Sequence, residues 1–127
     1  MFDKITIIGC GLIGSSLLRV IDKKKLSKQI NVFDKSKDNS EFIKNNFTVK
    51  VFKDVAESVS GSDLVIICSP LSSYKEILLS IKSKLKEGVI LTDTGSAKKE
   101  INKIVSNLNL NHVHWISSHP IAGTEFS

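Results

Sequence analysis

Short runs of β-branched and other apolar residues alternate along the chain with segments whose apolar residues recur every three or four positions. The short runs predict β-strands, and the three-to-four spacing predicts amphipathic helices. The expected strands cover residues 4–8, 29–33, 48–52, 64–68, 89–92 and 112–117. Strands that alternate with helices in this way indicate a parallel sheet with helices packed on its faces.

Five helical segments are expected between the strands. They run from Leu12 to the lysines at 23–25, through Phe42 and Ile43, from an Asp54 cap to Gly61, from Ser72 or Ser73 to Gly88, and over residues 97–108. In the first helix, Leu12, Ile13 and Leu18 belong to one apolar stripe. Such a stripe predicts the face that packs on the sheet.

The strand over residues 64–68 has no polar alternation, which is typical of a strand at the centre of a parallel sheet. Six strands joined by right-handed crossovers predict a Rossmann-type doubly wound sheet of order 3-2-1-4-5-6, formed by one domain over residues 1–127. In such sheets ligands bind beyond the carboxyl ends of the strands, where the order reverses. The segments expected at that edge are residues 9–14, Asp34, Ser69 with Pro70, residues 93–96, and His119 with Pro120.

Residues 9–14 read Gly-Cys-Gly-Leu-Ile-Gly, a G-x-G-x-x-G pattern between an expected strand and an expected helix. Gly9 would allow the sharp turn, Gly11 would let backbone N–H groups approach a pyrophosphate, and Gly14 would let the helix pack close to the sheet. With Leu12 and Ile13, these glycines form the predicted cofactor-binding turn, and Ser69 and Pro70 are predicted to border the same cofactor site. Ser15 stands where a Walker A motif requires lysine, so a nucleoside-triphosphate loop is excluded.

Asp34 follows the last glycine by twenty positions, at the end of the second expected strand. A carboxylate there can accept hydrogen bonds from a ribose 2′-hydroxyl and would repel the 2′-phosphate of NADP, so NAD is the predicted cofactor. Lys35 and Lys37 leave NADP open, because a lysine could pair with that phosphate. An alternative role for Asp34 is to cap the next turn.

Composition narrows the class of protein. The formal charge is +5, but Arg19 is the only arginine and the lysines are spread along the chain, which argues against a nucleic-acid partner. The start of the chain has no signal-peptide pattern and no apolar run is long enough to span a membrane, so a cytoplasmic protein without a membrane partner is expected. Cys10 and Cys68 suggest neither a disulfide framework nor a metal site.

Three histidines lie near the carboxyl end of the chain. His112 and His114 share a face of the expected strand, whereas His119 lies beyond its end. The three side chains would not readily converge on one metal ion, so no metal is predicted. A neutral His119 at the ligand edge could accept a hydroxyl proton. From the residues alone, a structural role for His119 remains an equal alternative.

Two further strings carry a family resemblance: Thr-Asp-Thr-Gly-Ser-Ala-Lys at 92–98 and Ser-His-Pro-Ile-Ala-Gly-Thr-Glu at 118–125. Together with the glycine motif and Cys-Ser-Pro at 68–70, they resemble the nucleotide-binding domain of prephenate dehydrogenases and their arogenate-using relatives, over the whole chain. The resemblance implies an NAD-dependent oxidative decarboxylation of prephenate in tyrosine biosynthesis. Ser96 and His119 would then be catalytic, with His119 polarising the substrate hydroxyl and Ser96 orienting it beside the nicotinamide. Both would also contact the substrate, and Thr124 and Glu125 would line its pocket.

In this family the nucleotide-binding domain continues into a helical domain that builds a homodimer and supplies basic groups for the substrate carboxylates. The chain stops at Ser127, so we expect an N-terminal portion that binds cofactor and is inactive alone. Arogenate dehydrogenase, another hydroxyacid or imino-acid oxidoreductase, and a non-catalytic NAD-binding module remain alternatives.

Overall fold

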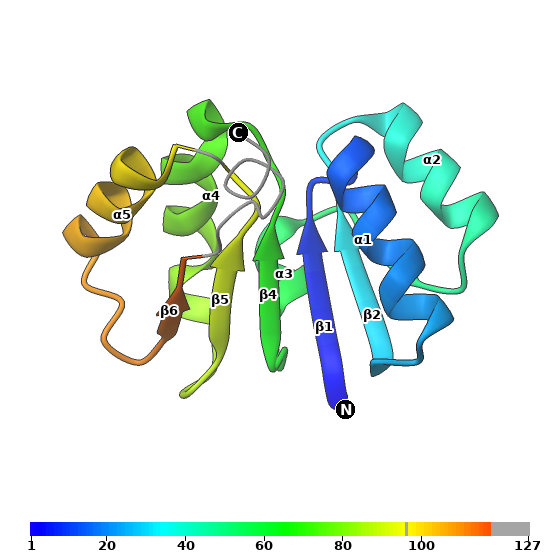
Figure 1. Cartoon of the computed structure of the whole chain (residues 1–127), viewed down its shortest axis with the longest axis horizontal. Helices are drawn as coiled ribbons and strands as arrows, with labels where there is room; N and C mark the ends of the chain where they lie inside the picture. The colour runs from blue at the N-terminus through cyan, green and yellow to red at the C-terminus, as the bar shows by residue number, and fades with distance from the viewer. Residues whose placement is uncertain (96, 118–127) are drawn as a thin grey trace, which may run out of the picture.

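A computed structural model of the chain describes residues 1–95 and 97–117. Within these residues, six strands form one sheet of order β3-β2-β1-β4-β5-β6, and every pair of neighbours is parallel (Figure 1). The strands are β1 (Phe2–Ile8), β2 (Ser27–Phe33), β3 (Lys50–Phe52), β4 (Leu64–Ile67), β5 (Ile90–Asp93) and β6 (His114–Ile116). The predicted Rossmann-type class and strand order are confirmed.

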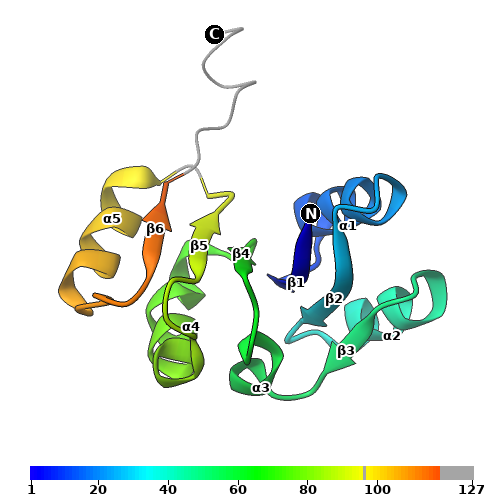
Figure 2. The same ribbon diagram turned by 90° about the horizontal axis from the view of Figure 1, so that it is seen from below.

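Helices connect successive strands and lie on both sides of the sheet (Figure 2). They are α1 (Leu12–Lys23), α2 (Lys37–Asn46), α3 (Val55–Val59), α4 (Tyr74–Ile81) and α5 (Lys98–Asn107), with short 3-10 turns at Leu71–Ser73 and Lys82–Lys84. Figure 2 shows α1 on one side of the strands and α3 and α4 on the other. This two-sided cover is the doubly wound arrangement, in which the crossovers change face where the strand order reverses.

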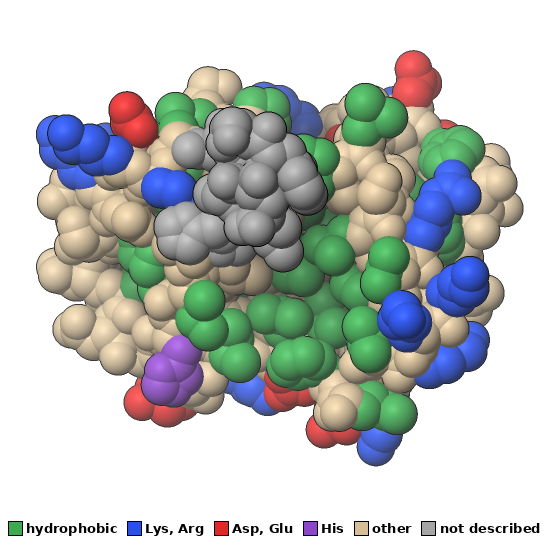
Figure 3. All heavy atoms as spheres, in the orientation of Figure 1, with side chains coloured by type: hydrophobic (Ala, Val, Ile, Leu, Met, Phe, Trp, Pro, Cys, Tyr) green, Lys and Arg blue, Asp and Glu red, His purple; other side chains and the backbone are tan. Residues whose placement is uncertain are grey.

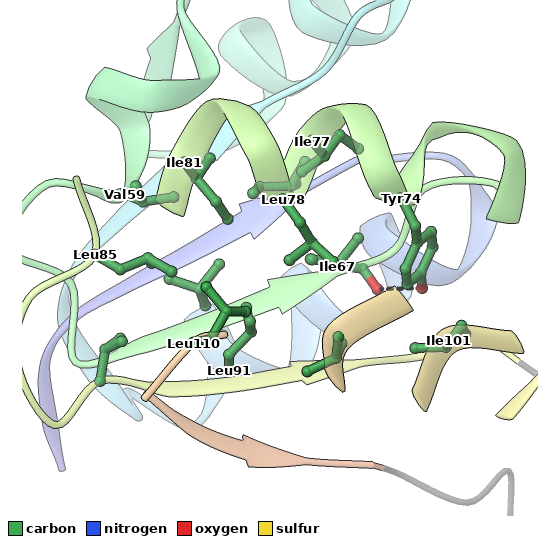
Figure 4. Packing of buried hydrophobic residues seen from close by; sticks show 14 residues of the cluster. Val59, Ile67, Tyr74, Ile77, Leu78, Ile81, Leu85, Leu91, Ile101 and Leu110 are labelled. Atoms are coloured by element: carbon green, nitrogen blue, oxygen red, sulfur yellow. Dashed lines mark hydrogen bonds between the residues drawn. The ribbon is translucent and has the colours of Figure 1, made fainter. Parts of the chain in front are cut away.

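The core consists of two apolar layers, one on each face of the sheet. Along β4, Val65 and Ile67 pack toward α4 and α5, whereas Ile66 belongs to the layer beneath α1 and α2. Figure 4 shows the first of these layers, in which side chains of α4 pack against β4, β5 and α5. β4 is central and apolar on both faces, as its lack of polar alternation predicted.

The boundaries of the elements differ from the sequence prediction in places that depend on pairing. β1 and β2 begin earlier than expected because Phe2 pairs with Ser27. The expected long helix to Gly88 is wrong in extent: α4 ends at Ile81, a 3-10 turn follows, and Gly88 has a φ of 81° in the turn before β5. Asp54 occupies the N-cap position of α3, but its side chain makes no capping hydrogen bond.

The apolar stripe expected on α1 is wrong at its start. Leu12 is 91% exposed and Ile13 is 59% exposed, whereas Leu18 and Ile21 are buried against the sheet. The first turn of α1 projects past the carboxyl ends of the strands, so there is no sheet beneath it to pack on.

Figure 3 shows hydrophobic side chains gathered at the centre of one face, over β1, β4 and β5, with lysine and arginine side chains toward its rim. In the residues that the structure covers, we find no helix of the length and apolar character that crossing a bilayer requires.

Candidate cofactor site

A cavity of about 910 Å³ opens at the carboxyl ends of the strands, along the upper edge of the sheet in Figure 1. Its walls come from four segments that are far apart in the sequence, the loops that follow β1, β2, β4 and β5. The cavity lies where the strand order reverses between β1 and β4, the position at which doubly wound sheets bind ligands.

The first wall is the turn between β1 and α1. Each of its glycines stands at its position for a different structural reason. Gly9 has a φ of 89°, a conformation that side chains with a Cβ rarely adopt, and a Cβ there would lie 2.6 Å from Ser69 Oγ. A Cβ on Gly14 would lie 2.2 Å from the carbonyl oxygen of Gly9, so α1 packs directly against the turn. A Cβ on Gly11 would meet nothing within 4 Å, which leaves open space above this residue.

Two of the predicted cofactor residues do not face the cavity themselves. Gly11 and Ile13 line it, but Gly14 lies beneath the turn and Leu12 points to solvent outside the lining residues. Gly14 thus shapes the site through close packing, whereas the side chain of Leu12 is exposed.

The second wall contains Asp34, which lines the cavity immediately after β2. Its Oδ2 accepts hydrogen bonds from the backbone N–H of Cys10 at 2.6 Å and from Asn39 Nδ2 at 3.2 Å. Its Oδ1 accepts from the backbone N–H of Ser36 at 2.8 Å. The alternative capping role of Asp34 is therefore real, and it coexists with a place in the cavity wall, because the same carboxylate does both.

The third wall follows β4. Ser69 and Pro70 both line the cavity, as predicted, and Ser69 Oγ donates a hydrogen bond to the carbonyl oxygen of Ile8 at 3.4 Å. Tyr74 continues this wall from the first turn of α4, and its hydroxyl donates to the carbonyl oxygen of Ile67 at 3.2 Å (Figure 4). Burial, followed by the nearby charge of Asp93, raises the pKa of Tyr74, so the phenol is a fixed donor at neutral pH.

The fourth wall follows β5 and includes Thr94, Gly95 and Ala97. Asp93 was expected just past the end of its strand, but it is the last residue of β5 and its side chain is completely buried. Its carboxylate forms an ion pair with Lys98 Nζ at 3.1 Å and accepts from the backbone N–H of Gly95 at 2.8 Å. These bonds brace the turn after β5. Sequence reasoning missed Lys98 and Tyr74, because only the folded chain brings them against this turn.

The two cysteines lie beside the site without offering a nucleophile. Burial, and next the charge of Asp34, raises the pKa of the Cys10 thiol to about 12. The pKa of Cys68 is also raised, chiefly by burial. Both thiols are free and protonated at neutral pH, and it is the thiolate that reacts.

Four of the predicted catalytic and substrate residues, Ser96, His119, Thr124 and Glu125, lie outside the described residues. Gly95 and Ala97, which flank Ser96 in the sequence, line the cavity. Among residues 1–95 and 97–117, no group of three or more acidic, histidine or cysteine side chains could hold a metal ion.

Comparison with known proteins connects this geometry to a family. A family model described as "Prephenate dehydrogenase, nucleotide-binding domain" matches residues 18–127. A cyclohexadienyl dehydrogenase of Zymomonas mobilis is 35% identical and aligns with 98% of this chain, which covers 43% of that protein. A prephenate dehydrogenase of Lactococcus lactis is 33% identical over 98% of this chain and 35% of its own length.

Solved structures share the fold. The prephenate dehydrogenase of A. aeolicus, in complex with hydroxyphenyl propionate and NAD⁺, superposes with a TM-score of 0.78 at 22% identity. The alignment covers 98% of this chain and 44% of that structure. The chain thus spans less than half the length of each of these relatives.

Proposed function

This chain belongs to the family of prephenate dehydrogenase nucleotide-binding domains, and from this premise we propose that it holds NAD for the oxidative decarboxylation of prephenate to 4-hydroxyphenylpyruvate. The observation that carries the proposal is the cavity itself. It joins the glycine turn and Asp34 on one side of the strand reversal to Thr94 and Gly95 on the other. A dinucleotide needs both halves, one for the adenosine and pyrophosphate and one for the nicotinamide.

Asp34 supports NAD over NADP. Its carboxylate lies in the wall at the end of β2, where it can accept from the ribose 2′-hydroxyl, and a 2′-phosphate would meet its negative charge. Of the two lysines that left NADP open, Lys35 lines the cavity, whereas Lys37 is exposed at the start of α2 and is absent from the lining. Because the positive charge of Lys35 lies in the same wall as Asp34, the preference for NAD is weaker than Asp34 alone would produce.

Calorimetric titration of the chain with NADH and with NADPH tests the cofactor. We expect NADH to bind more tightly, and we expect Asp34→Ala to reduce this preference by about tenfold, because a hydrogen bond to a charged group is lost together with the repulsion of the phosphate. Equal affinity of the unmutated chain for both cofactors would contradict the assignment of NAD.

In the proposed reaction, His119 is the base that accepts the proton of the substrate hydroxyl. When bound, NAD supplies the acceptor for a hydride from the ring carbon that bears the hydroxyl. His119 takes the proton of that hydroxyl as the carbonyl develops, and Ser96 orients the imidazole. Carbon dioxide then leaves, the ring becomes aromatic, and the proton returns to the phenol oxygen. Thr124 and Glu125 would line the substrate pocket. Support comes from the family motifs and from the position of Gly95 and Ala97, the neighbours of Ser96, in the cavity wall.

Substitution of His119 tests this mechanism. In an enzyme that contains this domain and converts prephenate, His119→Asn is expected to lower kcat by about 10² to 10⁴. The same substitution in the present chain should leave the affinity for NADH within about twofold, since His119 acts on the substrate hydroxyl. A kcat close to that of the unmutated enzyme would show that another group takes the proton.

Arogenate is the second candidate substrate. The Zymomonas mobilis relative is named for a cyclohexadienyl substrate, and both prephenate and arogenate have this ring. The two differ in a keto or amino group on the side chain, away from the hydroxyl on which His119 would act. Comparison of kcat/KM for the two substrates in the active enzyme decides between them.

A further inference from the structure

Among the described residues, three hydrogen-bond donors hold the carboxylate of Asp34. Two of these donors are the backbone N–H groups of Cys10 and Ser36, at 2.6 and 2.8 Å. The third is the side-chain amide of Asn39, whose Nδ2 lies 3.2 Å from Asp34 Oδ2. Backbone donors survive any substitution of their side chains. The amide of Asn39 is therefore the contact with Asp34 that evolution or mutagenesis can change most directly.

The position of Asn39 in α2 allows its side chain to hold the carboxylate of Asp34. It lies in the first turn of α2, where its backbone N–H donates to the Ser36 side chain at the N-cap, at 3.2 Å. The helix start thus fixes its backbone, and its half-buried side chain extends back toward Asp34 and lines the cavity. The amide of Asn39 thus reaches Asp34 Oδ2 from α2, whereas the Cys10 N–H that donates to the same oxygen belongs to the glycine turn.

Hydrogen bonds from the described residues engage Oδ2 of Asp34 more fully than Oδ1. An ionised carboxylate offers about four acceptor positions, two on each oxygen. Within the part of the chain that the structure describes, Oδ2 accepts from Cys10 and Asn39, whereas Oδ1 accepts from Ser36. In this orientation of the carboxylate, Oδ1 is the oxygen with more capacity to accept from a ligand hydroxyl, and the orientation depends on the bonds that Cys10 and Asn39 make to Oδ2.

We propose that Asn39 is a second determinant of cofactor preference, a positioning residue that fixes the rotamer of Asp34 so that Oδ1 faces the ribose 2′-hydroxyl. This inference rests on the proposed NAD-binding function. Without the amide, the backbone N–H groups of Cys10 and Ser36 still hold one carboxylate oxygen each, but the orientation of the carboxylate is less tightly fixed. This looser orientation weakens both its acceptance of the hydroxyl and its repulsion of a 2′-phosphate. Loss of Asn39 should therefore change the ratio of the two affinities.

The test is a calorimetric titration of the chain and its Asn39→Ala variant with NADH and with NADPH. We expect the preference for NADH over NADPH to fall by about three- to tenfold, the effect of losing one hydrogen bond. In the Asp34→Ala background, Asn39→Ala should leave the ratio unchanged, because the amide acts through Asp34. This double-mutant cycle separates the proposed role from a direct contact with the cofactor.

A control variant addresses the stability of α2. Asn46→Ala removes an amide at the other end of the same helix, where Nδ2 donates to the carbonyl oxygen of Phe42 at 2.7 Å. A loosened helix should weaken the binding of both cofactors alike, so this control should keep the NADH to NADPH affinity ratio of the unmutated chain.

The outcomes are distinct. If the unmutated chain prefers NADH and Asn39→Ala has the same ratio, the inference is overturned while the proposed function stands. If Asn39→Ala also shifts the ratio in the Asp34→Ala background, positioning of Asp34 is overturned in favour of direct contact. If the unmutated chain binds neither cofactor, the proposed function fails and the inference fails with it.

Discussion

Single residues in the glycine turn show how one motif combines separate physical requirements. Gly9 is required by its backbone conformation and by the close approach of Ser69, and Gly14 by the contact of α1 with the turn. Gly11 has neither requirement, because its φ is −73° and the space around its Cβ position is empty. We infer that glycine at position 11 leaves room for a ligand.

Matched alanine substitutions separate these roles. Gly14→Ala places a Cβ within 2.2 Å of a backbone oxygen that cannot move away cheaply, so the free energy of unfolding should fall by about 3 kcal/mol. Gly11→Ala should change it by less than about 1 kcal/mol, while it weakens NADH binding by about tenfold through lost pyrophosphate contacts. Urea denaturation and NADH titration of both variants provide the measurements.

The two variants are expected to differ, with a loss of stability for Gly14→Ala and a loss of NADH affinity for Gly11→Ala. A Gly14→Ala chain as stable as the unmutated one would show that α1 can shift from the turn without cost. A Gly11→Ala chain with unchanged NADH affinity would remove the argument that the second glycine makes room for the pyrophosphate.

At the scale of elements, the site edge of the sheet is open and the opposite edge is tied together by Asp63. This residue precedes β4, and its carboxylate accepts hydrogen bonds from the backbone N–H groups of Asp3 and Lys4 at 3.0 and 3.1 Å. Lys86, in the loop before β5, also donates to it. One side chain thus joins the starts of β1 and β4 to the segment that leads into β5.

Asp63 should make stability depend on acid pH. The bond from Lys86, and next the backbone bond from Lys4, lowers the pKa of Asp63 below its ordinary value of 3.8. The folded chain therefore favours the ionised form. Its contribution is complete above the unfolded pKa and is lost as pH falls through the lower folded pKa. We expect the difference in unfolding free energy between the unmutated chain and Asp63→Asn to be constant above about pH 5 and to shrink below about pH 4.

Urea denaturation between pH 6 and pH 3 measures this difference. Asp3→Asn is the matched control, because the Asp3 to Lys28 ion pair joins side chains that are 78% and 72% exposed, and such pairs contribute little. The Asp3→Asn profile should follow that of the unmutated chain. A difference for Asp63→Asn that stays constant down to pH 3 would be inconsistent with the lowered pKa.

Element boundaries were predicted less well than element types, for a physical reason visible in two helices. The side chains of Ile77, Leu78, Ile81 and Leu85, which recur at helical spacing, are all buried, yet the α-helix stops at Ile81 and the chain reaches Leu85 through a 3-10 turn. Periodicity identifies the buried face, but the end of a helix depends on where the sheet and the next strand begin. The same limit applies to α1, whose first turn extends beyond the sheet.

At the scale of the whole molecule, the strand order creates the site. The chain winds outward from β1 to β3, returns beside β1 as β4, and winds outward again to β6. Loops from both halves therefore diverge at one edge, and the cavity occupies the space between them. Residues separated by more than fifty positions, such as Asp34 and Gly95, border one cavity because all strands point the same way.

The sequence by itself determined the sheet, its strand order and the positions of Gly9, Gly11, Gly14 and Asp34 at the ligand edge. These follow from local periodicity and from rules of handedness that need no knowledge of contacts. The catalytic assignments of Ser96 and His119 come from motif resemblance and stay predictions.

Only the tertiary structure decided that Asp93 is buried against Lys98, that Leu12 points to solvent, and that Asp34 is held by Cys10 and Asn39. Each of these facts depends on which atoms surround a side chain after distant segments have packed together. Hydrophobic patterning specifies which face of an element is buried, whereas hydrogen-bond partners at the ends of elements depend on three-dimensional distances that patterning does not contain.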